Sequence, residues 1–144
     1  METITNNREE TIAFAKDLAK KIDYPKVIVL SGDLGAGKTT FSKGFAKGLG
    51  IEETITSPTF TLLNEYTGEK NLYHFDMYRL SSKEEAYELG FENYFEKNDG
   101  IILVEWAENV AGLFNPPYLK ISIEKLDEDK RKFILEEIVW IYYV

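Results

Sequence analysis

Two glycines, a lysine and a threonine with a fixed spacing occupy residues 32–39, which read GDLGAGKT. In this pattern Gly32 and Gly37 let the backbone turn and approach an anion closely. The ammonium group of Lys38 can then neutralise the outer phosphates of a nucleotide, and the hydroxyl group of Thr39 can reach Mg²⁺. The segment therefore predicts a phosphate-binding loop for a nucleoside triphosphate.

The sequence on both sides of this loop supports that interpretation. A phosphate-binding loop needs a strand that leads into it and a helix that follows it, because backbone N–H groups at the helix N-terminus converge on the phosphates. Residues 26–30 are mostly apolar and β-branched, as in a short buried strand. Residues 40–49 place Phe41 and Phe45 on one helical face, so both flanking elements are predicted.

A bound triphosphate also needs a carboxylate for its Mg²⁺ ion and a group that positions the attacking water. Glu105 is a candidate for the metal, because it follows the apolar run 101–104 at the carboxyl end of a predicted central strand. The alternative is that Glu105 ends the strand in solvent. Trp106 is either a core residue or a residue that packs near the nucleotide, since tryptophan usually owes its position to buried area.

The segment 73–79, which reads YHFDMYR, is a second group of polar residues that could serve the site. Strand alternation places His74 and Asp76 on one face. Asp76 could bind metal-linked water or act as a base, and Arg79 could stabilise phosphate charge. The alternative is an ion pair between Asp76 and Arg79 that holds the end of the strand. We interpret His74, the only histidine, as a hydrogen-bonded structural residue.

Ser57 and Thr59 form a hydroxyl pair on either side of Pro58. They lie between the loop helix and the next predicted strands, where other nucleotide hydrolases keep a segment that senses the γ-phosphate. A simple turn is an equally good interpretation of these residues.

Hydrophobic periodicity and turn residues predict the remaining elements. We expect a helix over residues 5–22, and a second helix that is capped by Ser81 or Ser82 and ends near Gly90. Strands are predicted at residues 60–66, 72–75, 101–104, 118–126 and 131–139, the last two as a hairpin at a sheet edge. The aromatic residues 140–144 could close that edge or contact a partner.

These elements predict an α/β fold. Central parallel strands that carry the loop, with antiparallel strands beside them, make a three-layer sandwich like that of P-loop NTPases. A nucleotide is then expected at the carboxyl ends of the central strands.

Length and composition limit the possible functions. The 144 residues suffice for one domain with one core and one site. Because the chain has no cysteine, disulfides, thiolate catalysis and sulfur-ligated metals are excluded, which fits a reducing cytoplasm. A net charge of -8 argues against independent binding to nucleic acid. With no signal sequence or membrane-spanning run, we expect a cytoplasmic protein without membrane contact.

Four motifs, in the same order and with similar spacing, resemble the bacterial TsaE family, formerly called YjeE. They are GDLGAGKTT at residues 32–40, SPTF at 57–60, HFDMYR at 74–79 and EW at 105–106. The resemblance implies an ATPase that uses ATP and Mg²⁺ and is required for making N6-threonylcarbamoyladenosine in tRNA. It also implies TsaD-type and TsaB-type partner subunits, with tRNA reached indirectly through their complex.

The resemblance also implies roles for individual residues. Lys38, Asp76 and Glu105 would be catalytic, and Thr39 and Glu105 would bind Mg²⁺. Trp106 would lie near the nucleotide, and Thr11 would border its adenosine end. The phosphate contacts would come from one continuous run, Asp33, Leu34, Gly35, Ala36, Gly37, Lys38, Thr39 and Thr40. No role is implied for the final hairpin.

Other protein classes use the same loop. A small-molecule kinase is the main alternative, but such kinases bring several arginines to the phosphates and acceptor, and this chain has only Arg8, Arg79 and Arg131. A GTPase switch is disfavoured because no Asn-Lys-x-Asp segment that reads guanine occurs. A third class is a nucleotide-dependent binding module. Its slow hydrolysis of the nucleotide would set the time at which a complex assembles. We expect weak intrinsic hydrolysis, since an arginine supplied by a partner can raise the rate by about 10³ to 10⁵.

Overall fold

The computed structural model describes residues 1–23, 26–33, 35–97 and 99–139. Within these residues, seven strands form one mixed sheet in the order β1-β7-β6-β2-β5-β4-β3. The strands are β1 (Glu2–Thr5), β2 (Val27–Gly32), β3 (Leu63–Tyr66), β4 (Asn71–Asp76), β5 (Gly100–Glu105), β6 (Tyr118–Lys125) and β7 (Arg131–Ile138). The helices are α1 (Arg8–Lys21), α2 (Lys38–Gly48), α3 (Lys83–Glu88), α4 (Glu92–Lys97) and the 3₁₀ turn η1 (Ala107–Val110). The predictions for Leu34 and for residues 140–144 fall outside the described residues.

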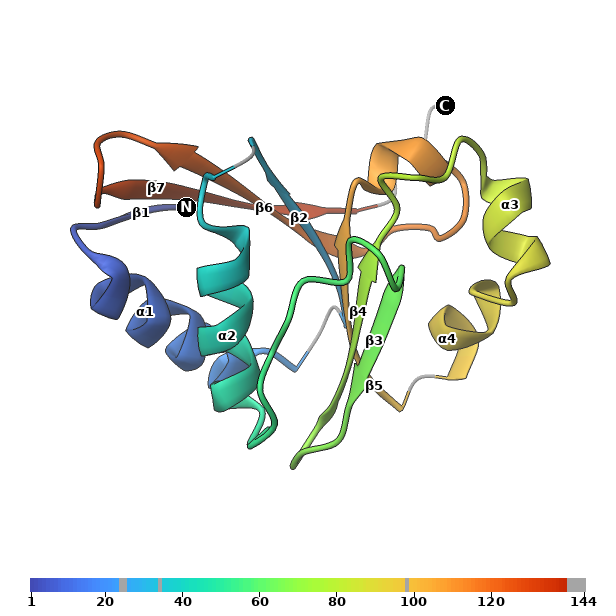
Figure 1. Cartoon of the computed structure of the whole chain (residues 1–144), viewed down its shortest axis with the longest axis horizontal. Coiled ribbons are helices and arrows are strands. Elements are labelled where there is room, and N and C mark those ends of the chain that lie inside the picture. The colour runs from blue at the N-terminus through green and yellow to red at the C-terminus, as the bar shows by residue number, and fades with distance from the viewer. Residues whose placement is uncertain (24–25, 34, 98, 140–144) are drawn as a thin grey trace.

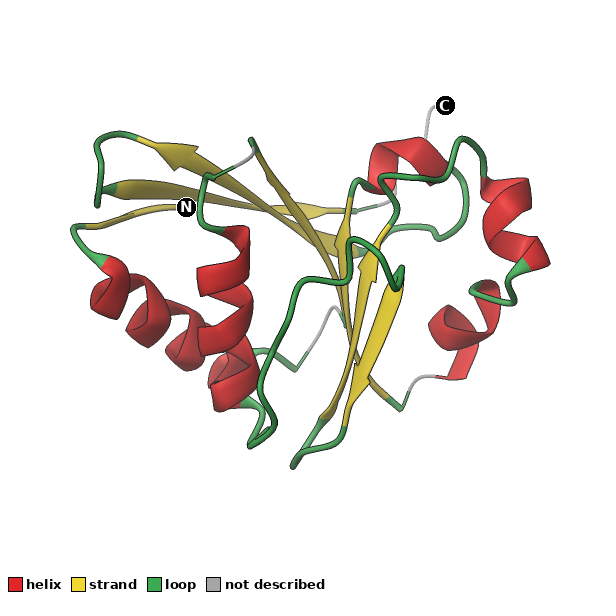
Figure 2. Ribbon diagram, in the orientation of Figure 1, coloured by secondary structure: helices red, strands yellow, loops and turns green. Residues whose placement is uncertain are grey.

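Helices cover both faces of the sheet, so the molecule has three layers (Figures 1 and 2). One layer holds α1 and α2, and the other holds α3, α4 and η1. The strands β4, β5, β2 and β6 run parallel to one another. The strands β3, β7 and β1 pair antiparallel on the outside of this group. The predicted three-layer α/β sandwich is confirmed.

The central strand β5 shows why an uninterrupted apolar run was a good strand signal. Ile101 and Leu103 belong to the core beneath α1 and α2. Ile102 and Val104 belong to the core beneath α3 and α4. Because successive side chains point to opposite faces, a strand covered on both sides must be apolar at every position.

The N-terminus differs from the prediction, because residues 2–5 form β1 and the helix begins only at Arg8. The side chain of Asn7 accepts a hydrogen bond of 2.8 Å from the N–H group of Glu10, which caps α1 at this point. β1 pairs with β7, from Glu2 opposite Ile134 to Thr5 opposite Arg131. A strand of four residues is too short for its alternation to be detected, and its partner is far away in sequence.

The position of the final hairpin was also predicted wrongly. β6 and β7 form the expected antiparallel pair, but β6 continues the parallel sheet next to β2, and β1 covers the outer side of β7. The start of β3 also differs from the prediction. The strand was expected to begin at residue 60, and it begins at Leu63. Leu62 has a φ of 68°, and this left-handed conformation cannot continue a strand.

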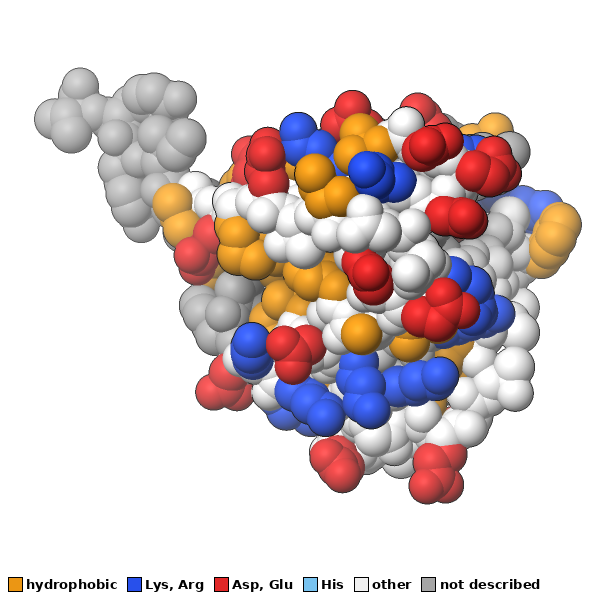
Figure 3. Space-filling view, turned by 90° about the vertical axis from the view of Figure 1, so that its left-hand side faces the viewer, with side chains coloured by type: hydrophobic (Ala, Val, Ile, Leu, Met, Phe, Trp, Pro, Cys, Tyr) orange, Lys and Arg blue, Asp and Glu red, His pale blue; other side chains and the backbone are white. Residues whose placement is uncertain are grey.

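The helices α1 and α2 pack closely because α2 presents glycine to α1. A Cβ atom added to Gly44 would lie 2.5 Å from the carbonyl oxygen of Ile12 and 3.0 Å from the Cβ atom of Ala15. On the solvent side, Lys16, Lys20 and Lys47 are exposed, and Figure 3 shows basic side chains in a band across the lower half of that face.

None of the described helices combines the length and the apolar character that a membrane crossing requires.

We expect Gly44→Ala to destabilise the protein. Alanine favours a helix over glycine by about 1 kcal/mol, but the new methyl group would collide with the α1 backbone, and overpacking of this kind costs about 1–3 kcal/mol. The measurement is the free energy of unfolding from urea denaturation, with Lys47→Ala as a control on the exposed side of the same helix. A stability equal to or above that of the wild type would contradict the close packing.

Candidate functional site

The predicted phosphate-binding loop connects β2 to α2, as the sequence indicated. Gly35 and Gly37 have φ angles of 79° and 108°, which only glycine adopts readily, and Gly37 stands immediately before the first residue of α2. Gly32 also has a packing role that the sequence did not indicate. A Cβ atom there would lie 3.0 Å from the carbonyl oxygen of Ile123, so glycine at this position favours the close approach of β6.

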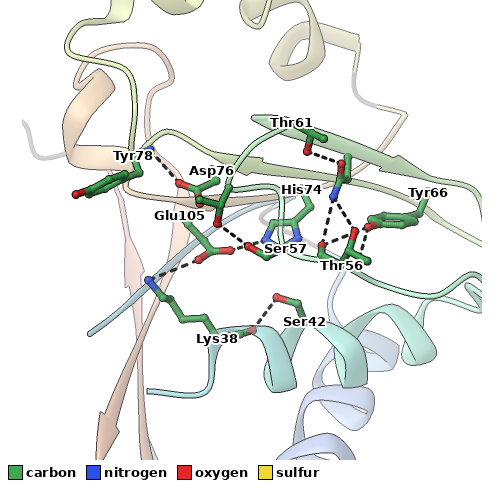
Figure 4. A network of polar contacts seen from close by, with 12 residues as sticks. Lys38, Ser42, Thr56, Ser57, Thr61, Tyr66, His74, Asp76, Tyr78 and Glu105 are labelled. Carbon is green, nitrogen blue, oxygen red and sulfur yellow. Dashed lines mark hydrogen bonds and ion pairs between the residues drawn. The ribbon is translucent and has the colours of Figure 1, made fainter. Parts of the chain in front are cut away.

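Three charged or polar side chains meet at the start of α2 (Figure 4). The Nζ atom of Lys38 lies 3.5 Å from Oε1 of Glu105. Oε2 of Glu105 lies 2.7 Å from Nε2 of His74. Lys38 comes from α2, Glu105 from the carboxyl end of β5 and His74 from β4, so three elements converge on one carboxylate.

The carboxylate of Glu105 is buried and yet ionised. Burial by itself raises its pKa, but the hydrogen bond and electrostatic interaction with His74 and the charge of Lys38 together outweigh this effect. The pKa of Glu105 therefore lies below its ordinary value. Because an ionised carboxylate can only accept hydrogen bonds, the Nε2–H group of His74 is the donor. The alternative in which Glu105 ends the strand in solvent does not hold, since the residue is buried.

Asp76 lies next to Glu105 in the parallel pairing of β4 with β5. Its side chain is buried, and its Oδ1 atom accepts a hydrogen bond of 2.9 Å from the N–H group of Tyr78. Arg79 forms no ion pair with Asp76 within the described part of the chain. Its guanidinium group lies 4.7 Å from the centre of the Phe60 ring instead.

Trp106 lies beside the loop lysine and is not a core residue. Its side chain is 36% exposed, and the Nζ atom of Lys38 lies 5.3 Å from the centre of its ring. The backbone of Trp106 has a φ of 59°, which is unusual for a bulky residue. The ring of Tyr78 packs on it with a centroid distance of 5.1 Å.

Two cavities adjoin the loop on different sides. A cavity of about 160 Å³ is lined by Asp33, Lys38, Trp106 and Glu108, among others. A second cavity of about 170 Å³ is lined by seven residues, Arg8, Thr11, Gly37, Thr40, Glu128, Asp129 and Arg131. The structure thus separates the sequence-predicted site residues into a group around Lys38 and a group around Thr11.

Thr11 borders the second cavity, but its hydroxyl group already has a partner. Oγ1 of Thr11 lies 2.7 Å from Oγ1 of Thr5, and both residues are buried. Ser57 and Thr59 behave similarly, because their hydroxyl groups lie 2.7 Å apart in an exposed segment without regular secondary structure. Within the described part of the chain, neither Thr11 nor the Ser57–Thr59 pair is hydrogen-bonded to the group around Glu105.

Arg131 is a residue that sequence reasoning missed. Its Nε–H group donates a hydrogen bond of 2.8 Å to the carbonyl oxygen of Ala36 in the loop. Its Nη1 atom donates to three carbonyl groups of the β6–β7 turn, those of Asp127, Glu128 and Lys130. Because the two segments are 95 residues apart in sequence, only the scarcity of arginine in the chain could have drawn attention to it.

The residues around the loop suit Mg²⁺ that is held together with a nucleotide. No group of three or more His, Asp or Glu residues within the described ranges could hold a metal ion by itself. Magnesium in nucleotide sites usually has one or two protein ligands, with phosphates and water as the others. The exposed residue Thr39 and the buried carboxylate of Glu105 match that smaller requirement.

Comparisons with known proteins agree on one family. The family described as "Threonylcarbamoyl adenosine biosynthesis protein TsaE" matches residues 5–133. The tRNA threonylcarbamoyladenosine biosynthesis protein TsaE of Rickettsia felis is 48% identical over 130 residues, which are 89% of this chain and 75% of that protein. The protein of the same name from Bacillus subtilis is 46% identical over 129 residues, or 89% and 80% of the two chains. The crystal structure of Bacillus subtilis YdiB is similar with a TM-score of 0.77 and 41% identity, covering 92% of this chain and 82% of that one.

We expect Arg131→Lys to loosen the phosphate-binding loop. Lysine keeps the charge but cannot bond to Ala36 and to the β6–β7 turn at once, so at least one hydrogen bond is lost, which costs about 1 kcal/mol or more. Urea denaturation measures the loss, and amide hydrogen exchange in residues 35–38 should become faster. The control is Lys130→Ala, which changes an exposed neighbour. Wild-type exchange in Arg131→Lys would show that Arg131 does not hold the loop.

Proposed function

Because the chain belongs to the TsaE family, whose role is in tRNA threonylcarbamoyladenosine biosynthesis, we propose that it is the Mg²⁺-dependent ATPase subunit of that process. In this proposal the whole chain acts as one ATPase domain that hydrolyses ATP to ADP and phosphate. The main support is the position of Lys38 at the start of α2, 3.5 Å from the buried carboxylate of Glu105. A Mg²⁺–triphosphate requires a positive side chain for its phosphates and a carboxylate for its metal ion. Lys38 and Glu105 provide these two groups close together.

The loop would bind the phosphates through its backbone and through Lys38. Residues 33–40, Leu34 included, precede or begin α2, where N–H groups without helical partners attract anions. Lys38 would leave Glu105 for the outer phosphates, because a triphosphate carries more negative charge than one carboxylate. Thr39 and Glu105 would then bind Mg²⁺, and Asp76 would orient the attacking water beside them.

The two cavities suggest where the rest of the nucleotide lies. The cavity that contains Trp106 and Lys38 would hold the terminal phosphate and the metal, so Trp106 would lie against the reacting end. The cavity that contains Thr11 and Thr40 would accept the adenosine end on the other side of Gly37. Thr11 would then form the wall of this cavity, since its hydroxyl group is bonded to Thr5.

The arginines argue against the alternative, a small-molecule kinase. Arg131 donates its hydrogen bonds to backbone carbonyl groups, and Arg79 lies over the ring of Phe60. Among the described residues, Arg8 lines a cavity beside the loop without a side-chain hydrogen bond, and that cavity lies on the side of Thr11. A kinase acceptor would therefore find few arginines near Glu105.

The ATPase proposal predicts distinct defects for two variants. Lys38→Ala should reduce ATP turnover at least about 100-fold, because an electrostatic contact to the transferred phosphate is lost. Glu105→Ala should chiefly remove the Mg²⁺ dependence of turnover. Phosphate release is measured over a range of Mg²⁺ concentrations, with Lys47→Ala as a control for an exposed lysine of the same helix. Unchanged Mg²⁺ dependence in Glu105→Ala would contradict the metal assignment.

We further predict that the protein hydrolyses ATP slowly alone and that TsaB-type and TsaD-type subunits raise the rate. No arginine of the described structure contacts Lys38 or Glu105, and an arginine added by a partner can contribute about 10³ to 10⁵. The assay compares the isolated chain, the chain with both subunits and the chain with candidate small-molecule acceptors. Stoichiometric phosphorylation of an acceptor would overturn the ATPase proposal in favour of a kinase.

We also propose where the protein acts and how it reaches tRNA. We expect it to act in the cytoplasm and to reach tRNA through the partner complex, because a net charge of -8 disfavours direct binding to a polyanion.

A further inference from the structure

The hydrogen bond between His74 and Glu105 plays no part in the proposed binding of the phosphates or of Mg²⁺. The imidazole is 1% exposed, and its Nε2 atom lies 2.7 Å from Oε2 of Glu105. The other carboxylate oxygen, Oε1, faces Nζ of Lys38 at 3.5 Å. Among the described residues each oxygen of Glu105 therefore has one partner, Lys38 from the phosphate-binding loop and His74 from β4.

The side chains of Lys38 and His74, the two partners of Glu105, differ in their freedom to move. Lys38 has a long flexible side chain on the first turn of α2, so it can exchange Glu105 for a phosphate group. His74 is a compact, buried ring in the middle of β4. When Lys38 turns to a nucleotide, Oε1 loses its cation, whereas Oε2 keeps its hydrogen bond.

The burial of His74 is difficult to explain by stability alone. Its second ring nitrogen, Nδ1, is buried and has no hydrogen-bond partner among the described residues. A buried polar atom without a partner reduces the free energy of unfolding, and an apolar side chain of similar size would avoid that loss. The remaining benefit of a histidine at this position is the bond that Nε2 donates to Glu105.

We propose that His74 is a positioning residue that holds the carboxylate of Glu105 in the orientation in which Oε1 receives the metal ion of a bound nucleotide. This inference rests on the proposed function. His74 itself touches neither the metal nor the phosphates. It limits the rotation of the Glu105 carboxylate, so that the metal-binding oxygen is already directed at the loop before the nucleotide arrives.

The test uses two amide variants that differ in the position of one N–H donor. The side-chain amide of His74→Gln can place its nitrogen near the former Nε2 position, whereas that of His74→Asn reaches only the Nδ1 position. Binding of Mn²⁺ to the protein–ATP complex, beyond that of ATP alone, is measured by electron paramagnetic resonance with protein in excess over ATP, together with ATP affinity in the absence of metal. Tyr73→Phe is the control, because it removes a hydrogen bond to Asp99 from the neighbouring residue of β4, on the opposite face.

We expect His74→Asn to weaken Mn²⁺ binding about 10–100-fold, the usual effect of losing a group that orients a metal ligand. His74→Gln should restore most of that affinity, and Tyr73→Phe should leave it unchanged. ATP affinity without metal should change little in all three variants. Thermal unfolding of each variant shows whether a change in metal affinity follows from loss of the fold.

The Mn²⁺ measurements distinguish a failure of the proposed function from a failure of the role of His74. If wild-type protein does not change the Mn²⁺ binding of ATP alone, the proposed function fails and the role of His74 fails with it. If the wild type binds Mn²⁺ and His74→Asn binds it equally well, only the proposal for His74 is overturned. Equal weakening in His74→Asn and His74→Gln would also overturn it, because the position of the donor would then not matter.

Discussion

The carboxylate of Glu105 connects the phosphate-binding loop to the centre of the sheet. It is buried at the end of β5, between Lys38 of α2 and His74 of β4. A buried charge is tolerated only when it is paired and hydrogen-bonded, so the three side chains depend on one another. Any change that moves α2 away from β5 would leave this carboxylate without compensation. The position of α2 on the sheet is therefore linked to the electrostatics of the site.

The order of the parallel strands makes this meeting possible. β5 lies between β2 and β4, so the residues that follow all three strands come to the same edge of the sheet. β2 leads into the loop, β4 ends at Asp76 and β5 ends at Glu105. Ligands of open α/β sheets bind at this edge for the same topological reason. Residues of α1 and α2, which approach each other closely at Gly44, share one buried core with the central strands β2 and β5.

Where the sequence-based prediction failed, the deciding contacts are distant in sequence. β1 was missed because four residues show little alternation, and it becomes a strand only through its pairing with β7. The hairpin of β6 and β7 was placed at an edge because a sequence does not reveal which strands lie beside it. Arg131 was given no role, and its bond to Ala36 exists only because this hairpin turn comes to the loop. His74 was correctly interpreted as hydrogen-bonded, but its partner is on another strand.

By itself, the sequence determined the features that depend on neighbouring residues. Glycines and Lys38 at fixed spacing specify the loop, an apolar run specifies β5, and Ser82 caps α3 through the N–H group of Glu85. These are local because a turn, a strand or a cap involves only a few consecutive residues. Only the tertiary structure decided that Lys38, His74 and Glu105 share one buried site. Strand order and helix packing bring these residues together, and their ionisation and hydrogen bonding depend on the burial that results.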